Sequence, residues 1–172
     1  MKLRAPQPGW TAKADVIVIG SGVAGLTTAL QIRSHDLSVL LVTKSLIDAG
    51  STKWAQGGIA AALGPGDSPE EHERDTLVAG AGLCDEEAVR VLVTEGPEAV
   101  RKLIARGAKF DRSETGEIAL TREGGHLRNR ILHAGGDATG AEVSRALLAA
   151  VNDDPGIEMV ENALVIDALK NK

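Results

Sequence analysis

The chain has 172 residues, of which 43% are hydrophobic and 25% charged, and this composition is typical of one globular domain. Its 19 basic and 24 acidic side chains give a net charge of −5, which argues against nucleic acid or an anionic membrane as partner. With one Phe, two Trp and no Tyr, the chain also lacks the aromatic residues that stack on single-stranded nucleic acid. A single cysteine, Cys84, excludes an intrachain disulfide, and no Cys/His spacing indicates a metal site.

The N-terminus carries no targeting signal that we recognise. No apolar segment follows Lys2 and Arg4, as a secretory signal would require, and no apolar run is long enough to cross a bilayer. We therefore expect a cytoplasmic protein. Residues 1–13 predict an irregular lead-in, and residues 14–172 predict one domain.

Two apolar runs near the start enclose a helix. Residues 15–19 are β-branched without polar alternation, which is typical of a strand buried on both faces of a parallel sheet. Residues 23–34 predict a helix and residues 38–42 a second buried strand, so the three form a βαβ unit with a right-handed crossover. The expected fold class is α/β, a Rossmann-like parallel sheet with flanking helices, and residues 157–161 are expected to supply its third parallel strand.

The middle of the chain predicts a loop and then helices. Residues 44–66 are rich in Gly, Ser and Ala and predict a long loop. A serine N-cap, a proline at the first position and a glutamate at the third make Ser68 the start of a helix. Asp85 predicts the cap of a second helix, and Pro97 the start of a third that ends at Gly107.

The last third of the chain gives weaker signals. Residues 110–120 contain turn residues and predict a short hairpin. Thr139 and Glu142 have the spacing of a capping box that opens a helix to about Asn152. After the turn at residues 154–156, residues 163–169 read as a further strand.

A complete glycine pattern lies between the first strand and the first helix, Gly20-Ser21-Gly22-Val23-Ala24-Gly25. The first glycine allows a tight turn, the second leaves no side chain between backbone and pyrophosphate, and the third lets helix and strand pack closely. The helix N-terminus then offers unpaired N–H groups and the positive end of its dipole to phosphates. This pattern predicts a bound dinucleotide.

The end of the second strand does not identify the dinucleotide. Thr43, Lys44 and Ser45 stand where an acidic residue usually binds a ribose. Lys44 is compatible with the 2′-phosphate of NADP, with the diphosphate or ribose of FAD, and with a solvated lysine. On this motif alone the alternatives stay open.

Two later segments have residues suited to a ligand. In residues 50–61, paired glycines let the backbone lie against a flat ring, while Ser51, Thr52 and Gln56 supply hydrogen bonds. In residues 122–126, Glu123 and His126 flank two glycines, and His133 follows. On the residues alone, a flexible loop explains the first segment equally well, and a solvated surface loop explains the second better than a site does.

Taken together, these segments resemble the succinate dehydrogenase/fumarate reductase flavoprotein superfamily, and most closely its L-aspartate oxidases. Residues 50–61, 75–85, 121–126, 130–134 and 137–140 carry the resemblance in order, within residues 15–169. It implies FAD-dependent oxidation of L-aspartate to iminoaspartate, with reoxidation by O2, which gives H2O2, or by fumarate. This would be the first step of de novo NAD (pyridine nucleotide) biosynthesis, with quinolinate synthase as a candidate partner.

The resemblance also implies the residues of the site. FAD contacts are expected from the glycine turn, the end of the second strand, the small-residue segment and one late backbone position: Gly20, Ser21, Gly22, Val23, Ala24, Gly25, Lys44, Ser51, Thr52, Lys53, Trp54, Ala55, Gln56, Gly57, Gly58 and Val165. Ser51 stands where respiratory members carry a histidine bonded to the flavin, so FAD is expected to be non-covalent. Glu123 is implied to meet the substrate's α-amino group, where respiratory relatives have a neutral amide, and so to orient an amino acid.

Members of this superfamily continue for several hundred residues beyond the length of this chain. The rest of the FAD domain, the capping domain and the C-terminal helical domain are therefore expected to be absent here, together with the arginine that accepts the proton. We expect the chain alone to be inactive. Two alternatives stay open, a flavoprotein of the fumarate reductase or succinate dehydrogenase type and a non-catalytic nucleotide-binding fragment.

Overall fold

The computed structural model describes residues 9–170, which form two compact units. Within the described range, unit 1 comprises residues 9–51 and 147–170, and unit 2 comprises residues 52–146. Most of the expected lead-in, residues 1–8, lies outside the described residues, and the domain start at residue 14 stays a prediction. Among the residues described, no helix has both the length and the apolar character that crossing a membrane requires.

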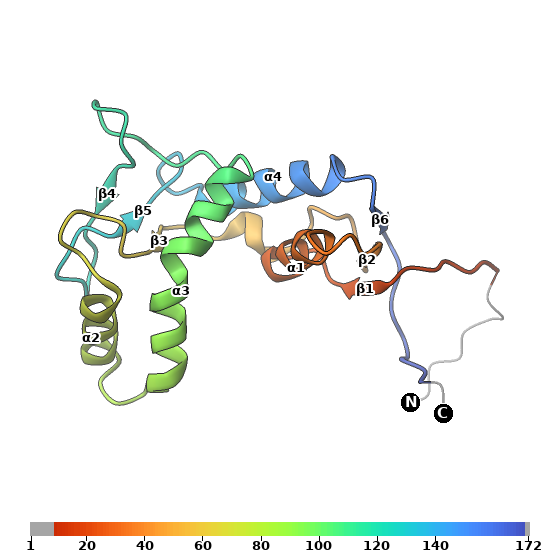
Figure 1. Ribbon diagram of the computed structural model, residues 1–172, viewed down its shortest axis with the longest axis horizontal. Helices are drawn as coiled ribbons and strands as arrows, with labels where there is room; N and C mark the ends of the chain where they lie inside the picture. Colours follow the sequence, from red (N-terminus) through yellow and green to blue (C-terminus); the bar gives the residue numbers. More distant parts are fainter. Residues whose placement is uncertain (1–8, 171–172) are drawn as a thin grey trace. The chain divides into compact units, whose positions relative to one another are not determined.

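A three-stranded parallel sheet lies at the centre of unit 1 (Figure 1). Strand β1 (Val16–Ile19) pairs with β2 (Val39–Val42), and β2 pairs on its other side with β6 (Ile157–Val160). Helix α1 (Val23–Arg33) connects β1 to β2. The prediction of an α/β fold with a parallel sheet, and of a third strand after residue 156, is therefore confirmed.

The three strands differ in how deeply they are buried. In the register of the sheet, Leu41 lies between Val18 and Met159, and all of β2 is buried. In β1, by contrast, Ile17 and Ile19 are 59% and 64% exposed. The prediction that both strands are buried on both faces is thus wrong for β1. A β-branched run favours strand geometry, whereas burial also needs an element packed against each face. Within residues 9–170, the face of β1 that carries Ile17 and Ile19 is not covered in this way.

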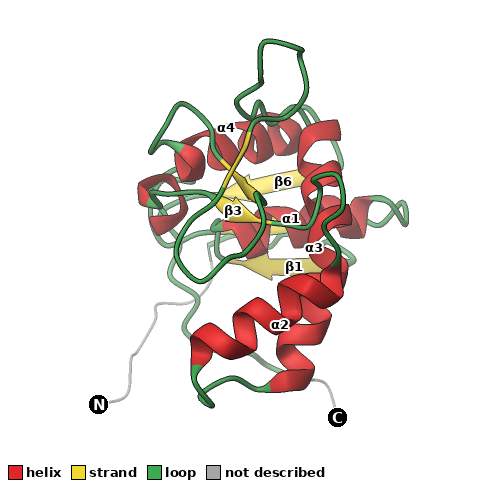
Figure 2. Cartoon of the chain, turned by 90° about the vertical axis from the view of Figure 1, so that its left-hand side faces the viewer, coloured by secondary structure: helices red, strands yellow, loops and turns green. Residues whose placement is uncertain are grey.

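Two helices of unit 2 pack side by side (Figure 2). Helix α2 (Pro69–Gly80) starts as predicted, because the Ser68 hydroxyl accepts a hydrogen bond from the Glu71 N–H at 3.2 Å. Helix α3 (Glu86–Ala105) is capped by Asp85, whose carboxylate accepts from the Ala88 N–H at 2.9 Å. Both caps satisfy N–H groups that have no partner within the helix.

Pro97 does not start a third helix, and this prediction is wrong. It lies inside α3, where Val89, Val93, Pro97 and Val100 are all buried and follow the helical spacing. The proline removes one backbone hydrogen bond, but the chain keeps one continuous apolar face by remaining helical. The helix ends close to the predicted point, with Gly107 at φ 93° just beyond it.

A small antiparallel sheet completes unit 2. Strand β5 (Ile131–Leu132) lies between β3 (Ile59–Ala60) and β4 (Leu120–Thr121). The predicted short hairpin at residues 110–120 is present. Arg112 and Ile118 form an antiparallel bridge, flanked by backbone hydrogen bonds from the Ser113 N–H to the Glu117 carbonyl at 2.8 Å and from the Ala119 N–H to the Asp111 carbonyl at 2.9 Å. The predicted loop at residues 44–66 contains β3 and the short 3-10 helix η1 (Ser51–Trp54).

Helix α4 (Thr139–Asn152) has the predicted extent, but not the predicted cap. The Thr139 hydroxyl accepts from the Ala134 N–H at 3.2 Å, and the Glu142 carboxylate accepts from the Lys109 N–H. Both side chains of the expected capping box therefore accept hydrogen bonds from residues outside the helix.

Residues 163–169 form no strand, contrary to the prediction. The Ala163 N–H donates to the Thr43 carbonyl at 3.0 Å, and within the described range no strand pairs with the segment that follows. Its larger apolar side chains are exposed. Strand propensity alone does not make a strand here, because the segment has no partner edge to pair with.

Candidate functional site

The glycine turn after β1 has the geometry that the motif requires. Gly20 adopts φ 104°, a conformation that favours glycine, and its N–H donates to the Val42 carbonyl at 2.8 Å. A Cβ at Gly25 would overlap the carbonyl oxygen of Gly20. The third glycine is therefore the residue that lets α1 approach the turn.

A hollow of about 440 Å³ lies in unit 1, at the carboxyl ends of β1 and β2. Ligands of open α/β sheets bind at this end of the strands. The hollow is lined by residues from the glycine turn, the end of β2, the segment after it and the segment after β6, including the predicted cofactor residues Gly20, Ser21, Gly22, Lys44, Ser51 and Val165. Sequence positions as far apart as 20 and 165 are thus neighbours in one concave surface.

Hydrogen bonds to Thr43, directly after β2, connect the segments that line this hollow. The buried Ser21 hydroxyl donates to the Thr43 hydroxyl at 3.2 Å, which ties the glycine turn to β2. The Ala163 N–H donates to the Thr43 carbonyl, and this hydrogen bond holds the segment that contains Val165 beside the end of β2. Sequence reasoning assigned no role to Thr43, for which the only signal is a hydroxyl at the end of a buried strand.

The residues of this hollow fit the phosphate-bearing part of a dinucleotide. The first turn of α1 contains no acidic side chain, so no carboxylate of that turn would repel a phosphate from the positive end of the helix dipole. Lys44 adds a cation to the same lining, and Leu164 and Val165 add apolar surface. The hollow therefore offers a positive charge to the phosphates of a dinucleotide and apolar surface to a flat ring.

The other predicted cofactor residues, 52–58, belong to unit 2. Trp54 is exposed, and the Lys53 ammonium lies 5.3 Å from the centre of its ring. Gly57 has φ 75°, and a Cβ at Gly58 would lie 2.6 Å from the Leu132 carbonyl oxygen. The paired glycines are thus needed for the turn before β3 and for the approach of β5. Val23 and Ala24, the remaining predicted contacts, are exposed in the first turn of α1.

The connection between β4 and β5 places Glu123 against His133. The Glu123 Oε1 lies 3.0 Å from the His133 Nε2, and the Thr121 hydroxyl lies 3.1 Å from the same nitrogen. The glutamate side chain is 51% exposed and the histidine side chain 19%. One carboxylate oxygen is therefore held by the protein, while half of the side chain faces solvent.

His126, the other predicted candidate, makes no comparable contact. It meets Glu123 only through the backbone, where the His126 N–H donates to the Glu123 carbonyl at 3.2 Å. Its ring lies 5.4 Å from that of His72, and its buried Nδ1 has no hydrogen-bond partner among the residues described. The structure thus brings His133, and not His126, to the Glu123 carboxylate.

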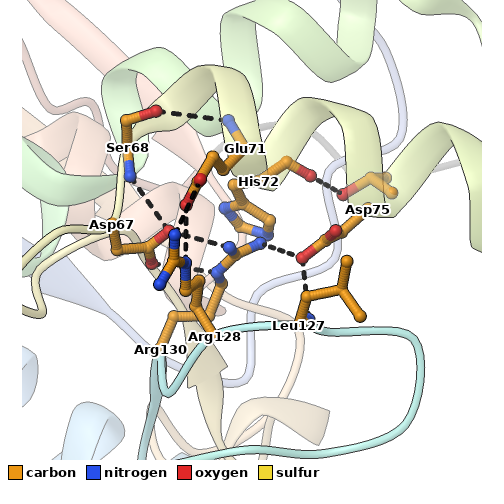
Figure 3. A network of polar contacts seen from close by, with 9 residues as sticks. Asp67, Ser68, Glu71, His72, Asp75, Leu127, Arg128 and Arg130 are labelled. Atoms are coloured by element: carbon orange, nitrogen blue, oxygen red, sulfur yellow. Dashed lines mark hydrogen bonds and ion pairs between the residues drawn. The ribbon is translucent and has the colours of Figure 1, made fainter.

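A buried ion cluster holds the far end of the same loop to α2 (Figure 3). The Arg130 guanidinium is fully buried and binds both oxygens of Asp67 at 3.0 and 2.7 Å. Its Nη1 lies 3.0 Å from Asp75, whose carboxylate also accepts from the Leu127 N–H at 2.9 Å. Arg130 therefore joins the end of the loop to the start and the middle of α2.

Two further residues of α2 complete this cluster. On its surface, Arg128 pairs with Glu71 at 2.8 and 2.9 Å, and this hydrogen bonding lowers the pKa of the Glu71 carboxyl. In its interior, burial lowers the pKa of His72, and the charge of Arg130 lowers it further. The members of this cluster are up to 63 positions apart, so no local sequence pattern predicts their pairing.

The chain matches the model of a family described as FAD binding domain, over residues 15–171. This match indicates FAD as the cofactor, in agreement with the glycine turn and the hollow beside it.

Curated relatives named L-aspartate oxidase are similar over almost the whole chain. The protein from Streptomyces coelicolor is 66% identical over 98% of this chain, and the one from Arabidopsis thaliana, named chloroplastic, is 52% identical over 92%. The chain spans only 29% and 24% of these two relatives.

Among solved structures, a quinol–fumarate reductase with menaquinol molecules has a TM-score of 0.84 at 28% identity, covering 92% of this chain and 28% of its own. Sdh1 of Mycobacterium smegmatis has a TM-score of 0.79 at 34% identity, covering 87% of this chain and 27% of its own. The fold is therefore that of the FAD-binding domain in these flavoproteins.

Proposed function

The chain belongs to the FAD binding domain family, and we propose that the protein containing it is an FAD-dependent L-aspartate oxidase, which converts L-aspartate to iminoaspartate. The observation that carries this proposal is the 66% identity to the Streptomyces coelicolor L-aspartate oxidase over 98% of the chain. A fumarate reductase activity has weaker support, since the reductase with TM-score 0.84 is only 28% identical. The proposal concerns the whole protein, and we expect residues 1–172 by themselves to be inactive.

In this proposal, residues of unit 1 bind the diphosphate of FAD. The glycine turn supplies backbone N–H groups without side chains, and Lys44 supplies a cation to the same hollow. When bound, FAD supplies the acceptor for the hydride that leaves the substrate Cα. The hydroxyl of Ser51, which also lines the hollow, forms no covalent flavin bond, so acid precipitation should leave the yellow cofactor in the supernatant. Contacts of residues 52–58 with the flavin stay a prediction.

Glu123 is proposed to select the substrate. Its half-exposed carboxylate can accept a charge-assisted hydrogen bond from an α-ammonium group, worth about 1.5–3 kcal/mol. Succinate and fumarate have no ammonium, so the same carboxylate only repels these doubly anionic ligands. The side chain therefore favours an amino acid over a plain dicarboxylate of the same length.

The test is Glu123→Gln in the full-length enzyme, which keeps the shape of the side chain and removes its charge. We expect kcat/KM for aspartate to fall roughly ten- to a hundredfold, which corresponds to the energies above, and fumarate reduction to be unchanged or faster. Glu114→Gln, a change at an exposed glutamate of the same unit, is the control. Equal loss of both activities would make Glu123 a structural residue and contradict its assignment.

The remaining parts of the proposal concern the electron acceptor, the pathway, the partner enzyme and the location in the cell. Reoxidation by O2 or fumarate, a place at the first step of NAD biosynthesis, and delivery of the product to quinolinate synthase follow from the aspartate oxidase assignment. A cytoplasmic location is proposed with them, although the rice and Arabidopsis relatives are named chloroplastic.

A further inference from the structure

We propose that His133 is a positioning residue for Glu123, and that through this contact it contributes to the preference for an amino-acid substrate. The inference rests on the proposed function, because it assigns a partner to the carboxylate that is to meet the α-ammonium. The observation behind it is the 3.0 Å contact between the His133 Nε2 and the Glu123 Oε1.

The imidazole itself is held in place from several sides. Its Nδ1 faces the Gly136 carbonyl at 3.3 Å, and its Nε2 lies 3.1 Å from the Thr121 hydroxyl. Its Cε1 would be 3.1 Å from a Cβ at position 58, so the glycine there leaves room for the ring. The two neighbours of His133 in the chain, Leu132 and Ala134, are buried. A ring fixed in this way can act as a rigid support for a flexible neighbour.

Hydrogen-bond chemistry defines what the ring offers to Glu123. A carboxylate only accepts hydrogen bonds, so the Nε2 that faces Glu123 must carry a hydrogen. The Gly136 carbonyl oxygen lies 3.3 Å from Nδ1, on the side of the ring away from Glu123. Because this contact engages Oε1, the Oε2 of Glu123 is left for a ligand.

This arrangement lowers the cost of binding an ammonium group. Glu123 lies in a connection between two-residue strands and is half exposed, so without a partner its side chain would sample several rotamers. A carboxylate that is ordered before the ligand arrives loses less conformational freedom on binding. Ligands without an ammonium gain nothing from this order, so removal of His133 should affect aspartate alone.

The experiment uses the full-length enzyme with bound FAD and compares His133→Leu with His133→Gln. The leucine removes the donor, whereas the glutamine amide nitrogen reaches about as far as Nε2 and can still donate to Glu123. We expect His133→Leu to lower kcat/KM for aspartate about tenfold, with fumarate reduction within about twofold of the unchanged enzyme. His133→Gln should recover most of the loss. His126→Gln, in the same loop but without contact to the Glu123 carboxylate, should leave the ratio of the two activities unchanged.

A double-mutant cycle separates this inference from the function on which it rests. If His133 acts through Glu123, His133→Leu should cause no further loss of aspartate activity in the Glu123→Gln enzyme. If Glu123→Gln itself spares aspartate oxidation, the assigned role of Glu123 is wrong. If Glu123→Gln is selective but the effect of His133→Leu is absent, equal for both substrates or additive, the role of His133 is wrong.

Should His133→Leu fail to retain FAD, His133→Asn replaces it, because the asparagine amide is too short to reach Glu123. Asparagine must then lower the aspartate activity while glutamine does not, and equal activities of the two variants would overturn the proposal.

Discussion

Arg130→Met should destabilise unit 2 more than any change to a surface ion pair. The Arg130 side chain is 0% exposed, and the carboxylates it serves, Asp67 and Asp75, are 1% and 4% exposed. Methionine fills much of the same space but leaves both carboxylates buried without a cation. Removing one partner of a buried ion pair costs about 3–5 kcal/mol of the free energy of unfolding, since the charge left behind has lost its compensation.

The neighbouring pair provides the matched control. Arg128 and Glu71 also form a two-point contact between the loop and α2, but their side chains are 49% and 33% exposed. Solvent screens such pairs, and exposed pairs contribute about 0–1 kcal/mol. Arg128→Met should therefore change stability little, although it removes the same functional group two positions away.

The measurement is urea-induced unfolding at neutral pH, with the midpoint and slope of the transition compared between the two variants and the unchanged protein. Adding Asp67→Asn and Asp75→Asn to Arg130→Met should restore part of the loss, because the amide oxygens still accept from the Ser68 and Leu127 N–H groups. If Arg130→Met cost no more than Arg128→Met, the cluster would not be the anchor of the loop, and the reasoning would be refuted.

Two further predictions concern the glycine turn and the buried histidine. Gly25→Ala should sharply reduce FAD retention, measured from the flavin absorbance of the purified protein, because its Cβ would meet the Gly20 carbonyl; Gly9→Ala, where a Cβ meets nothing, is the control. Burial lowers the pKa of His72 below its usual 6.5, so as the pH falls the unfolded chain takes up this proton before the folded one. Stability should therefore decline from about pH 6.5 downward, and His72→Gln should flatten that decline between pH 7 and 5.5; an unchanged pH profile in the variant would contradict the assignment.

Local sequence signals predicted the elements that depend on local physics. The strand–glycine–helix order around Gly20, the caps at Ser68 and Asp85, and the extent of α4 were all predictable, because each depends on residues a few positions apart. Pro97 shows where such reasoning fails. The proline is a local signal for a helix start, but the continuous apolar face that it shares with Val93 and Val100 is a tertiary property.

Placement of site residues shows the same limit. The sequence indicated which residues belong to a nucleotide site, but not that Lys44 and Val165 line one hollow, because that depends on the pairing of β2 with β6. Similarly, Glu123 and His133 were candidates in isolation. Their contact arises from the β4–β5 pairing, and no spacing rule predicts a pair across two-residue strands.

The β4–β5 connection shows why its supporting charges are buried while Glu123 is not. On the α2 side, Arg130 and its two carboxylates are paired with one another and excluded from solvent, so a ligand cannot compete for them. On the other side, Glu123 keeps one internal partner and half of its surface. A side chain that is to bind an ion must keep part of its charge unpaired within the protein. The buried charges that hold this side chain in place must, by contrast, be paired with one another. The exposed carboxylate of this loop is therefore the one suited to an incoming ammonium group, and its position depends on charges that the ligand never meets.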